Sequence, residues 1–387
     1  MKRILLLEPN PYHGEVLPGL TKYFEDIGYV VDVYLQKKVY DERPFCRYMH
    51  SGKLFSYNMK NIHKILSEDS IRKYDFLVLS SMEYGHDGKI ERFLDYLGFM
   101  PDTKYGVLGI YHTVTLINQF NDASLLNEGR LFCLSEFQTQ NNVFNLKMLN
   151  PHYFCQDLKL FSGFQDKRRF LVIGNAAELH ILADNVLSLD EKQRDEINIK
   201  YIGGGPTAII NQIRLFIRNP IKHVDFIGRT INFLMAYLKN NSNESNVISK
   251  LGRLCFWEMY TEIENTDFII VMIDSQKHQH QHYLKYSTSG VFQLILGFKK
   301  VCLIQRDVAN IFGFTEKNCI MYDGENLAST LEVAVSLSEN EYQDKLNNLD
   351  EFELEIYQKS LENLRTSIDV IISQRAITSK NQEGIIS

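Results

Sequence analysis

The feature that most constrains the fold is a regular alternation of short aliphatic runs with amphipathic segments. "RILLLEP" (3–9) is a continuous aliphatic run, as expected of a strand that is buried on both faces. "VLPGLTKYFEDIG" (16–28) follows with helical spacing and a terminating glycine, and "YVVDVYL" (29–35) has the composition of the next strand. This alternation predicts a parallel sheet covered by helices.

The same pattern continues and then restarts in the second half of the chain. In the first half we predict helices near 58–73 and over 87–99, and strands at 75–82, 105–112 and 130–135. In the second half we predict strands at 169–175, 199–205, 223–229, 266–274, 299–305 and 318–324. A chain of 387 residues suits two domains. We therefore expect an α/β protein with two tandem Rossmann-like, doubly wound domains, 1–163 and 168–340, a cleft between them, and C-terminal helices with a tail over 341–387.

Composition excludes several classes of protein. The chain is 44% hydrophobic and 23% charged, which is typical of a globular protein, and its net charge of −6 offers no basic field for nucleic acid. Six scattered cysteines without a CxxC pair favour a reducing compartment. The N-terminal apolar run is too short for a signal peptide, and the longest later one is too short for a membrane span. We expect a cytoplasmic protein.

Two basic or histidine-rich stretches suggest other partners. Arg214, Arg218 and Lys222 recur every four residues on one predicted helix face, which suits either peripheral contact with the inner face of a membrane or, preferably, solvent. "HQHQH" (278–282) has alternating histidines, but its flanks are polar and no cysteine or aspartate partner is evident. We predict no metal site there.

A polar, uncharged turn precedes the apolar helical segment "VFQLILGF". Ser287, Thr288, Ser289 and Gly290 are expected at the N-terminus of this helix, where free N–H groups and the positive end of the helix dipole can hold an anion. The alternative is a Ser/Thr N-cap without a ligand.

Residues directly after other strands could add to an anion site. Arg229 follows the strand at 223–229 and could bind phosphate bidentately or form a surface salt bridge. Asn175 follows the strand at 169–175 and is small enough to admit a ligand. Neither glycine-bearing strand end in this half has the G-x-G-x-x-G pattern of a dinucleotide site.

His13 is the first candidate for a general base. It lies in "EPNPYHGEV", between the first strand and its helix, and a histidine pKa near neutrality suits proton transfer. Glu15 could orient it or could simply favour the helix N-terminus. His112, at the end of the strand "GIYHTV", and Glu83, after the strand at 75–82, are the rivals. A solvent-exposed loop histidine without a catalytic role is the alternative.

Over residues 2–340 the chain resembles glycosyltransferases of the GT-B type. "ILLLEPNPYHGEVLPGLTKYFEDIGYVV" is similar to the opening strand, loop and helix of that family. "YSTSGVFQLILGFKKVCLI" is similar to its segment of the form "SG…EAlayGkPVi", although Lys300 stands where the family has proline. The retaining subgroup has a Glu-x7-Glu pair whose matching positions here are Lys285 and Gln293.

The resemblance implies transfer of a sugar from a nucleoside-diphosphate sugar, with UDP the expected nucleotide, to a glycan, lipid-linked saccharide or other hydroxyl acceptor in polysaccharide biosynthesis. It implies that residues 287–290 bind the diphosphate and that His13 is the base of an inverting reaction that needs neither metal nor cofactor. We expect Tyr286, Gln293, Arg229 and Asn175 beside the donor, and the aromatic-rich segment 36–57 on the acceptor side. The alternatives are a nucleotide-sugar epimerase of the same fold and a non-catalytic partner protein.

Overall fold

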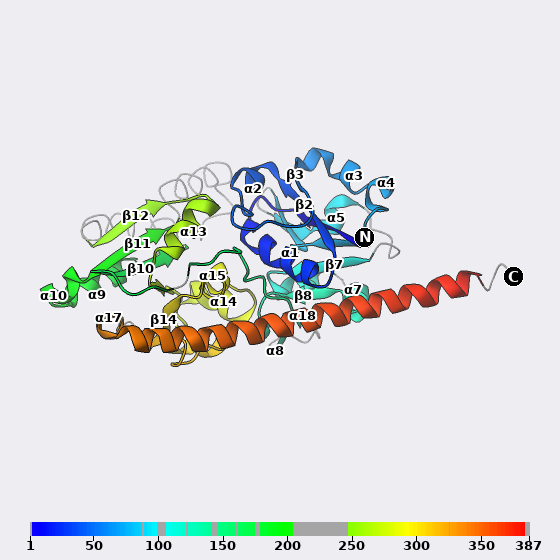
Figure 1. The fold of residues 1–387 in the computed structure, drawn as a ribbon. Coiled ribbons are helices and arrows are strands. Elements are labelled where there is room, and N and C mark those ends of the chain that lie inside the picture. Colours follow the sequence, from blue (N-terminus) through cyan, green and yellow to red (C-terminus); the bar gives the residue numbers. More distant parts are fainter. Residues whose placement is uncertain are drawn as a thin grey trace, which may run out of the picture. The chain divides into compact units, whose positions relative to one another are not determined.

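The computed structural model describes residues 2–86, 89–98, 106–120, 123–140, 146–159, 161–174, 179–203, 247–324 and 326–383. The chain divides into two compact units (Figure 1). The first unit comprises Met1–Asp157, Gln281–Gly297 and Glu351–Ser387, and the second comprises Leu158–His280 and Phe298–Asp350. The segment with the polar turn thus groups with the first unit, whereas the sequence analysis assigned it to the second domain.

The first unit is built on a sheet of seven parallel strands in the order β3-β2-β1-β4-β7-β8-β9. The strands are β1 (Arg3–Glu8), β2 (Val30–Gln36), β3 (Leu54–Tyr57), β4 (Phe76–Leu79), β7 (Val107–Tyr111), β8 (Leu131–Cys133) and β9 (Lys147–Met148). The strand order reverses between β1 and β4, where Ile4 is in register with Phe76. Rossmann-type sheets bind ligands beyond the carboxyl ends of their strands at such a point.

Helices cover both faces of this sheet. The helices of the first unit include α1 (Leu17–Asp26), α2 (Lys37–Asp41), α3 (Ile62–Ile65), α4 (Glu68–Ile71), α5 (Phe93–Leu97), α6 (Ile117–Phe120), α7 (Ala123–Asn127), α8 (Glu136–Gln140), α14 (Gln281–Lys285), most of α15 (Gly290–Phe298) and the later part of α18 (Glu339–Glu383). Ile4 and Leu6 of β1 pack in the cluster that contains α1 and α18, and Leu5 and Leu7 pack in the cluster that contains α5. Both faces of β1 are therefore buried, as its aliphatic run predicts.

The second unit repeats the same topology with six parallel strands in the order β12-β11-β10-β13-β14-β15. They are β10 (Arg168–Ile173), β11 (Ile197–Ile202), β12 (Ile248–Gly252), β13 (Phe268–Ile270), β14 (Val301–Gln305) and β15 (Ile320–Tyr322). Its helices include α9 (Leu179–Ser188), α10 (Glu191–Asp195), α13 (Phe256–Glu264), α16 (Arg306–Phe312) and α17 (Ala328–Ser336). The prediction of two Rossmann-like domains is confirmed.

The structure corrects the prediction of a helix over 87–99. β5 (Glu83–His86) and β6 (Lys89–Arg92) form an antiparallel hairpin, and of the described residues in this range only Phe93–Leu97 is helical. Ile90, Phe93, Leu94 and Leu97 have helical spacing in the sequence, but Ile90 is 63% exposed on the hairpin. The apolar spacing therefore did not mark one continuous buried face.

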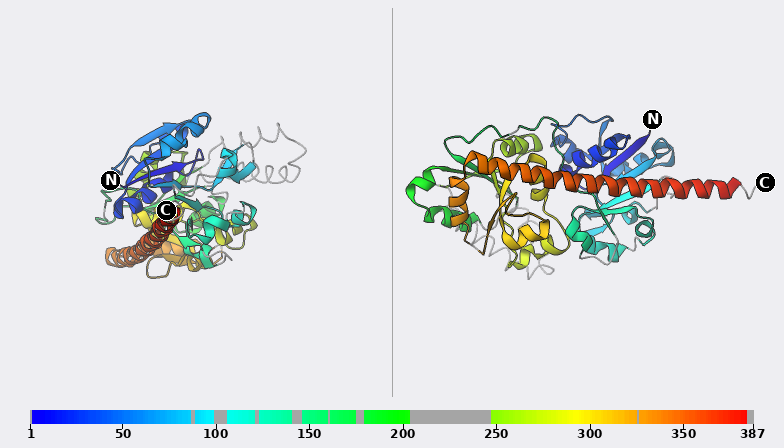
Figure 2. Two further views of the ribbon diagram at one scale, coloured as in Figure 1. Left: turned by 90° about the vertical axis from the view of Figure 1, so that its right-hand side faces the viewer. Right: turned by 60° about the horizontal axis from the view of Figure 1, so that its bottom comes forward.

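The C-terminal segment, predicted as one helix or two, is the single helix α18 (Figures 1 and 2). The strand predicted at 223–229 lies outside the described residues. Across the part of the chain that is described, no helix has both the length and the apolar character needed to cross a membrane.

Candidate active site

The loops that follow β1, β4 and β7 carry most of the polar residues of the candidate site. These strands are neighbours in the sheet of the first unit, so their carboxyl ends lie side by side. The loop after β1 contains His13 and Glu15, the loop after β4 contains Ser80 and Ser81 and leads to Glu83 at the start of β5, and His112 directly follows β7.

Glu8, the last residue of β1, is a fully buried carboxylate beneath this group. Its Oε1 accepts a hydrogen bond from the Asn10 backbone N–H at 2.7 Å. Its Oε2 accepts from the Ser80 hydroxyl at 2.6 Å and from the Ser81 hydroxyl at 3.0 Å. Burial raises the pKa of Glu8 to about 7, although the positive charge of His13 and these hydrogen bonds act in the opposite direction. The hydrogen bonds of Glu8 thus connect the loop after β1 to the loop after β4.

His13 has a backbone conformation that is uncommon outside glycine, with φ of 65°. Its Nδ1 lies 3.4 Å from Glu15 Oε1, and its ring centroid lies 4.1 Å from that of His112. Burial lowers the pKa of His13, but the hydrogen bond and charge of Glu15, with the charges of Glu8 and Glu83, outweigh it, so the pKa is raised. An uncommon backbone conformation and a pKa raised by neighbouring carboxylates are both typical of residues in functional sites.

His112 is poorly suited to accept a proton. Its Nε2 lies 2.9 Å from the Ser80 carbonyl oxygen and 3.1 Å from the Ser81 hydroxyl. Because a carbonyl can only accept, Nε2 carries the hydrogen. Burial, reinforced by the positive charge of His13, lowers the pKa of His112 to about 3. His112 therefore stays neutral beneath His13.

Glu83 remains a second candidate base. Its Oε1 accepts a hydrogen bond from the Thr113 N–H at 2.7 Å, whereas its buried Oε2 has no partner among the described residues. Burial raises the pKa of Glu83 to about 7. The three rival bases of the sequence analysis are thus close neighbours in one unit.

The polar turn before α15 is attached to the loop after β7. Ser287 forms an antiparallel bridge with Thr113, and the Tyr286 carbonyl accepts from the Val114 N–H at 3.0 Å. Gln138 Nε2 donates to the Tyr286 carbonyl at 2.9 Å and to the His112 carbonyl at 3.2 Å. These bonds place the turn next to the strand end that carries His112.

Close packing also holds the other end of α15 in the first unit. A Cβ at Gly297 would lie 1.9 Å from the His152 carbonyl oxygen and 2.5 Å from the Phe154 ring. Only glycine allows this approach, so the position of the helix is well defined at both ends.

Glu15 lies between His13 and the first residue of α15. A Cβ at Gly290 would be 3.8 Å from Glu15 Oε1, which is an ordinary contact distance. Near the same turn, the Thr288 hydroxyl and both amide atoms of Gln293 are buried without a hydrogen-bond partner among the described residues. Because buried polar groups are normally paired, their unmet capacity marks the turn as a candidate ligand site.

Several predicted site residues do not join this group. Asn175 and Arg229 lie outside the described residues, as do Arg214, Arg218 and Lys222 of the predicted membrane-facing helix. The side chain of Tyr286 is 43% exposed. His280 is buried, and its Nδ1 accepts from the Asp274 N–H at 2.9 Å. The described residues contain no group of three or more His, Cys, Asp or Glu that could hold a metal.

Sequence reasoning missed the residues that support His13. Glu8, Asn10, Ser80, Ser81 and Gln138 act through contacts between segments far apart in the chain. The available signal was local: a carboxylate ends the buried strand at 3–8, and a Ser-Ser pair ends the buried strand at 76–79.

No family model and no curated protein matches this sequence. Solved structures do match the fold. A glycosyltransferase from Rickettsia africae is similar at 12% identity and a TM-score of 0.55, over 96% of this chain and 99% of that one. An alpha-glucosyltransferase in complex with UDP and DNA is similar at 11% identity and a TM-score of 0.55, over 96% and 99%. Anabaena HepE in complex with UDP and glucose is similar at 11% identity and a TM-score of 0.52, over 95% of this chain and 100% of that one.

The chain has the GT-B fold. The resemblance predicted from the sequence is confirmed at the level of fold. Two of these three structures are named as a glycosyltransferase and an alpha-glucosyltransferase, and two of the three are complexes that contain UDP. Identities of 11–12% extend this likeness no further than the fold.

Proposed function

We propose that this GT-B protein transfers a sugar from a nucleoside-diphosphate sugar, with UDP the first nucleotide to test, to a hydroxyl acceptor. The observation that carries the proposal is the pairing of Ser287 with Thr113. This pairing brings the N-terminus of an apolar helix beside Glu15, which in turn contacts His13. An anion-binding helix terminus and a candidate base thus share one site.

In the proposed reaction, His13 accepts the proton of the acceptor hydroxyl. The acceptor oxygen forms a bond to the anomeric carbon as the bond from that carbon to the diphosphate oxygen breaks, with inversion. Once His13 has accepted the proton, its positive charge and the negative charge of Glu15 cancel. Glu15 therefore adds no net repulsion toward the departing diphosphate. The departing diphosphate is stabilised at residues 287–290 by the helix dipole and by the N–H groups of Thr288, Ser289 and Gly290, which supply the charge that a metal provides elsewhere. The Ser287 N–H already donates to the His282 carbonyl at 2.9 Å.

On the donor side, we propose that Tyr286 and Gln293 contact the nucleotide, with Asn175 and Arg229 as further predicted contacts. The buried, unpaired amide of Gln293 supports such a contact, since a ribose hydroxyl could accept and donate to it. On the acceptor side, Phe45, Tyr48 and Tyr57 of the segment 36–57 pack in the cores. Tyr40 is 40% exposed and is available for sugar stacking.

A transfer assay tests this proposal. The protein is incubated with UDP-, GDP-, ADP- and dTDP-sugars, each with and without mixed glycan and lipid-linked acceptors, and nucleoside diphosphate and sugar identity are both measured. We expect diphosphate release that depends on acceptor. Conversion of the donor sugar without acceptor would instead identify an epimerase. Absence of both activities across the panel would favour a non-catalytic partner protein.

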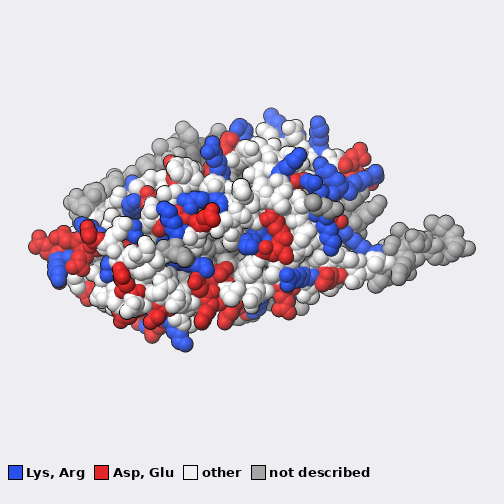
Figure 3. All heavy atoms as spheres, viewed as in Figure 1, with Lys and Arg blue, Asp and Glu red and all other residues white. Residues whose placement is uncertain are grey.

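We further propose a peripheral contact between the first unit and an anionic membrane surface. Lys and Arg gather over α2, β3, α3 and α4 (Figure 3). The exposed cations of this basic patch are Lys37, Lys38, Arg43, Lys53, Lys60 and Lys64. Met49 and Tyr40 are 82% and 40% exposed in the same segment of the chain. A segment that carries both exposed cations and exposed apolar side chains suits the headgroup region of an anionic bilayer.

Sedimentation with vesicles checks this contact. Because a lysine near an anionic surface contributes about 1 kcal/mol, Lys38→Gln with Lys64→Gln should weaken binding to vesicles rich in phosphatidylserine roughly 30-fold. The matched control, Lys192→Gln with Lys317→Gln, removes two exposed charges from the second unit and should leave binding unchanged. Equal losses in both variants, or no binding by the unaltered protein, would contradict the contact.

A further inference from the structure

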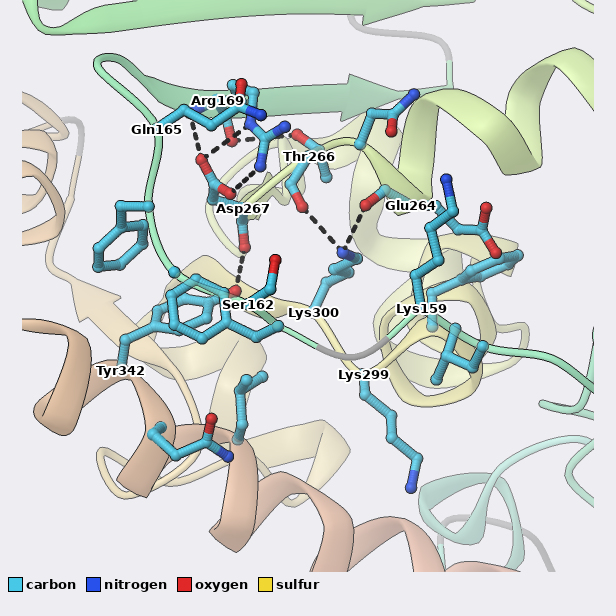
Figure 4. A pocket seen from close by; sticks show the side chains of 18 of the residues that line it. Lys159, Ser162, Gln165, Arg169, Glu264, Thr266, Asp267, Lys299, Lys300 and Tyr342 are labelled. Carbon is cyan, nitrogen blue, oxygen red and sulfur yellow. Dashed lines mark hydrogen bonds and ion pairs between the residues drawn. The ribbon is translucent and has the colours of Figure 1, made fainter.

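The second unit contains a cavity at the edge of its sheet where β10, β13 and β14 begin (Figure 4). Its volume is about 500 Å³. The walls come from the segment before β10, the end of α13, the junction between α15 and β14, and the start of α18. The proposed transfer reaction makes no use of this edge, because ligands of Rossmann-type sheets bind at the carboxyl ends of the strands.

Lys300 provides a buried positive charge in the wall of this cavity. The residue is 8% exposed, and its Nζ donates to the backbone carbonyls of Glu264 at 3.0 Å and Thr266 at 2.9 Å. Both acceptors are neutral carbonyls, and no described carboxylate forms an ion pair with Lys300. An ammonium group has three hydrogens, and these bonds use two of them. Buried charges are normally paired, but among the described residues no carboxylate makes a direct ion pair with Lys300.

The acidic residues that line the cavity act mainly on other groups. Asp267 binds the guanidinium of Arg169 at 2.6 Å, and Asp350 binds Lys299 at 2.9 Å. Burial lowers the pKa of Lys300 to about 8. The negative charge of Asp267 and, more weakly, that of Glu264 act in the opposite direction and raise this pKa. The charge of Arg169 lowers this pKa further. An anion next to Lys300 would therefore gain a strong, poorly compensated electrostatic partner.

The rest of the cavity wall contains both apolar and polar side chains. Apolar surface comes from Leu158, Phe161, Phe298 and Leu346. The ring centroids of Phe161 and Tyr342 lie 4.6 Å apart. Polar surface comes from Ser162, Gln165, Asn265 and Gln343. Figure 4 shows Ser162 and Lys300 facing the same space. The cavity therefore combines many polar and charged side chains with a smaller apolar surface, as a ligand with both a charged group and an apolar body requires.

We propose that this cavity binds a small amphipathic anion, in which a carboxylate or phosphate meets the Nζ of Lys300 and an apolar body packs against Phe161, Phe298 and Leu346. The polar side chains of the cavity wall determine the orientation of the bound anion. This site is independent of the donor site, and its occupancy does not require the proposed transfer activity.

Calorimetric titration of the full-length protein tests the site with four probes. Octanoate and phenyl phosphate each combine an anion with an apolar body and distinguish carboxylate from phosphate. Inorganic phosphate carries only the charge, and 1-octanol only the apolar body. We expect one molecule of octanoate or phenyl phosphate to bind at least tenfold more tightly than either of the last two. Binding of 1-octanol as tight as that of octanoate would overturn the role of Lys300.

Two variants localise the binding. Lys300→Met should reduce the affinity for the tighter anion at least tenfold, but it also removes two hydrogen bonds at the end of α13. Ser162→Phe keeps those bonds and fills the cavity, and it should reduce the affinity equally. Lys317→Met, an exposed lysine outside the cavity, should have no effect. Unchanged affinity in both cavity variants, or no binding to the unaltered protein, would overturn the proposal.

The pH dependence of binding provides a further readout. The charged groups that face Lys300 are Asp267, Arg169 and Glu264, and Lys159, Lys299 and Asp350 line the same cavity. Lys300 is charged below pH 8 and loses its proton as the pH rises through that value. The affinity for octanoate should therefore fall severalfold between pH 7 and pH 9, and binding at pH 8 should take up protons. Affinity that does not change with pH would contradict the role of Lys300.

Discussion

Replacing His13 with alanine is expected to lower the turnover number for sugar transfer by about 10²–10⁴-fold, the usual contribution of a general base. Affinity for the nucleotide should change little, because Glu15 lies between His13 and the turn at 287–290 and, among the described residues, no hydrogen bond joins His13 to that turn. Initial rates at saturating donor and acceptor measure the first effect, and calorimetry with UDP measures the second.

Two matched variants assign the base among the neighbouring candidates. Glu83→Gln keeps the Thr113 hydrogen bond to Oε1 and should reduce turnover far less than His13→Ala. His112→Asn removes a ring that stays neutral and should also have the smaller effect. A large loss in Glu83→Gln with normal turnover in His13→Ala would identify Glu83 as the base.

The pH profile of the same reaction separates His13 from a residue that only supports the fold. Turnover should fall as the pH drops through the pKa of His13, because a protonated imidazole cannot accept the acceptor proton. Since the hydrogen bond and charge of Glu15 raise that pKa, Glu15→Gln should move this limb of the profile to lower pH. An unshifted profile would show that another group titrates.

Gly290→Ala is expected to weaken UDP binding by about 10–100-fold, which corresponds to the loss of one hydrogen bond to a charged group. The added methyl group would lie 3.8 Å from Glu15 Oε1, so the fold should tolerate it. Alanine also has a higher helix propensity than glycine. The methyl group would, however, project from the first residue of α15, where a diphosphate must approach the backbone N–H groups.

Local sequence patterns were sufficient to predict most of the sheet. The segments predicted as strands at 3–9, 29–35 and 299–305 each form a strand of a parallel sheet, over residues 3–8, 30–36 and 301–305. The hairpin formed by β5 and β6 was missed because Ile90 has helical spacing with the apolar residues of α5, while Ile90 itself lies in β6, where the backbone pairs from Glu83 with Arg92 to His86 with Lys89 form the hairpin. Strand β12 was missed because "ISKLG" is partly exposed and lacks an aliphatic run.

The candidate site was predicted less completely than the fold. His13, His112 and Glu83 could be proposed because each lies in the segment that follows a predicted strand, and the sheet order then brings them together. The position of the polar turn could not be predicted, because it depends on the pairing of Thr113 with Ser287 and on Gln138, which are distant in sequence. The buried hydrogen bonds of Glu8 are long-range contacts of the same kind.

The account depends most on where the diphosphate binds, and calorimetric titration of UDP into the unaltered protein and into Gly290→Ala tests this directly. Thermal unfolding without ligand first establishes that the two proteins are equally stable. We predict one UDP bound by the unaltered protein and at least tenfold weaker binding by the variant. Equal affinity in the two proteins, or no UDP binding by either at millimolar concentration, would contradict the assignment of the turn at 287–290.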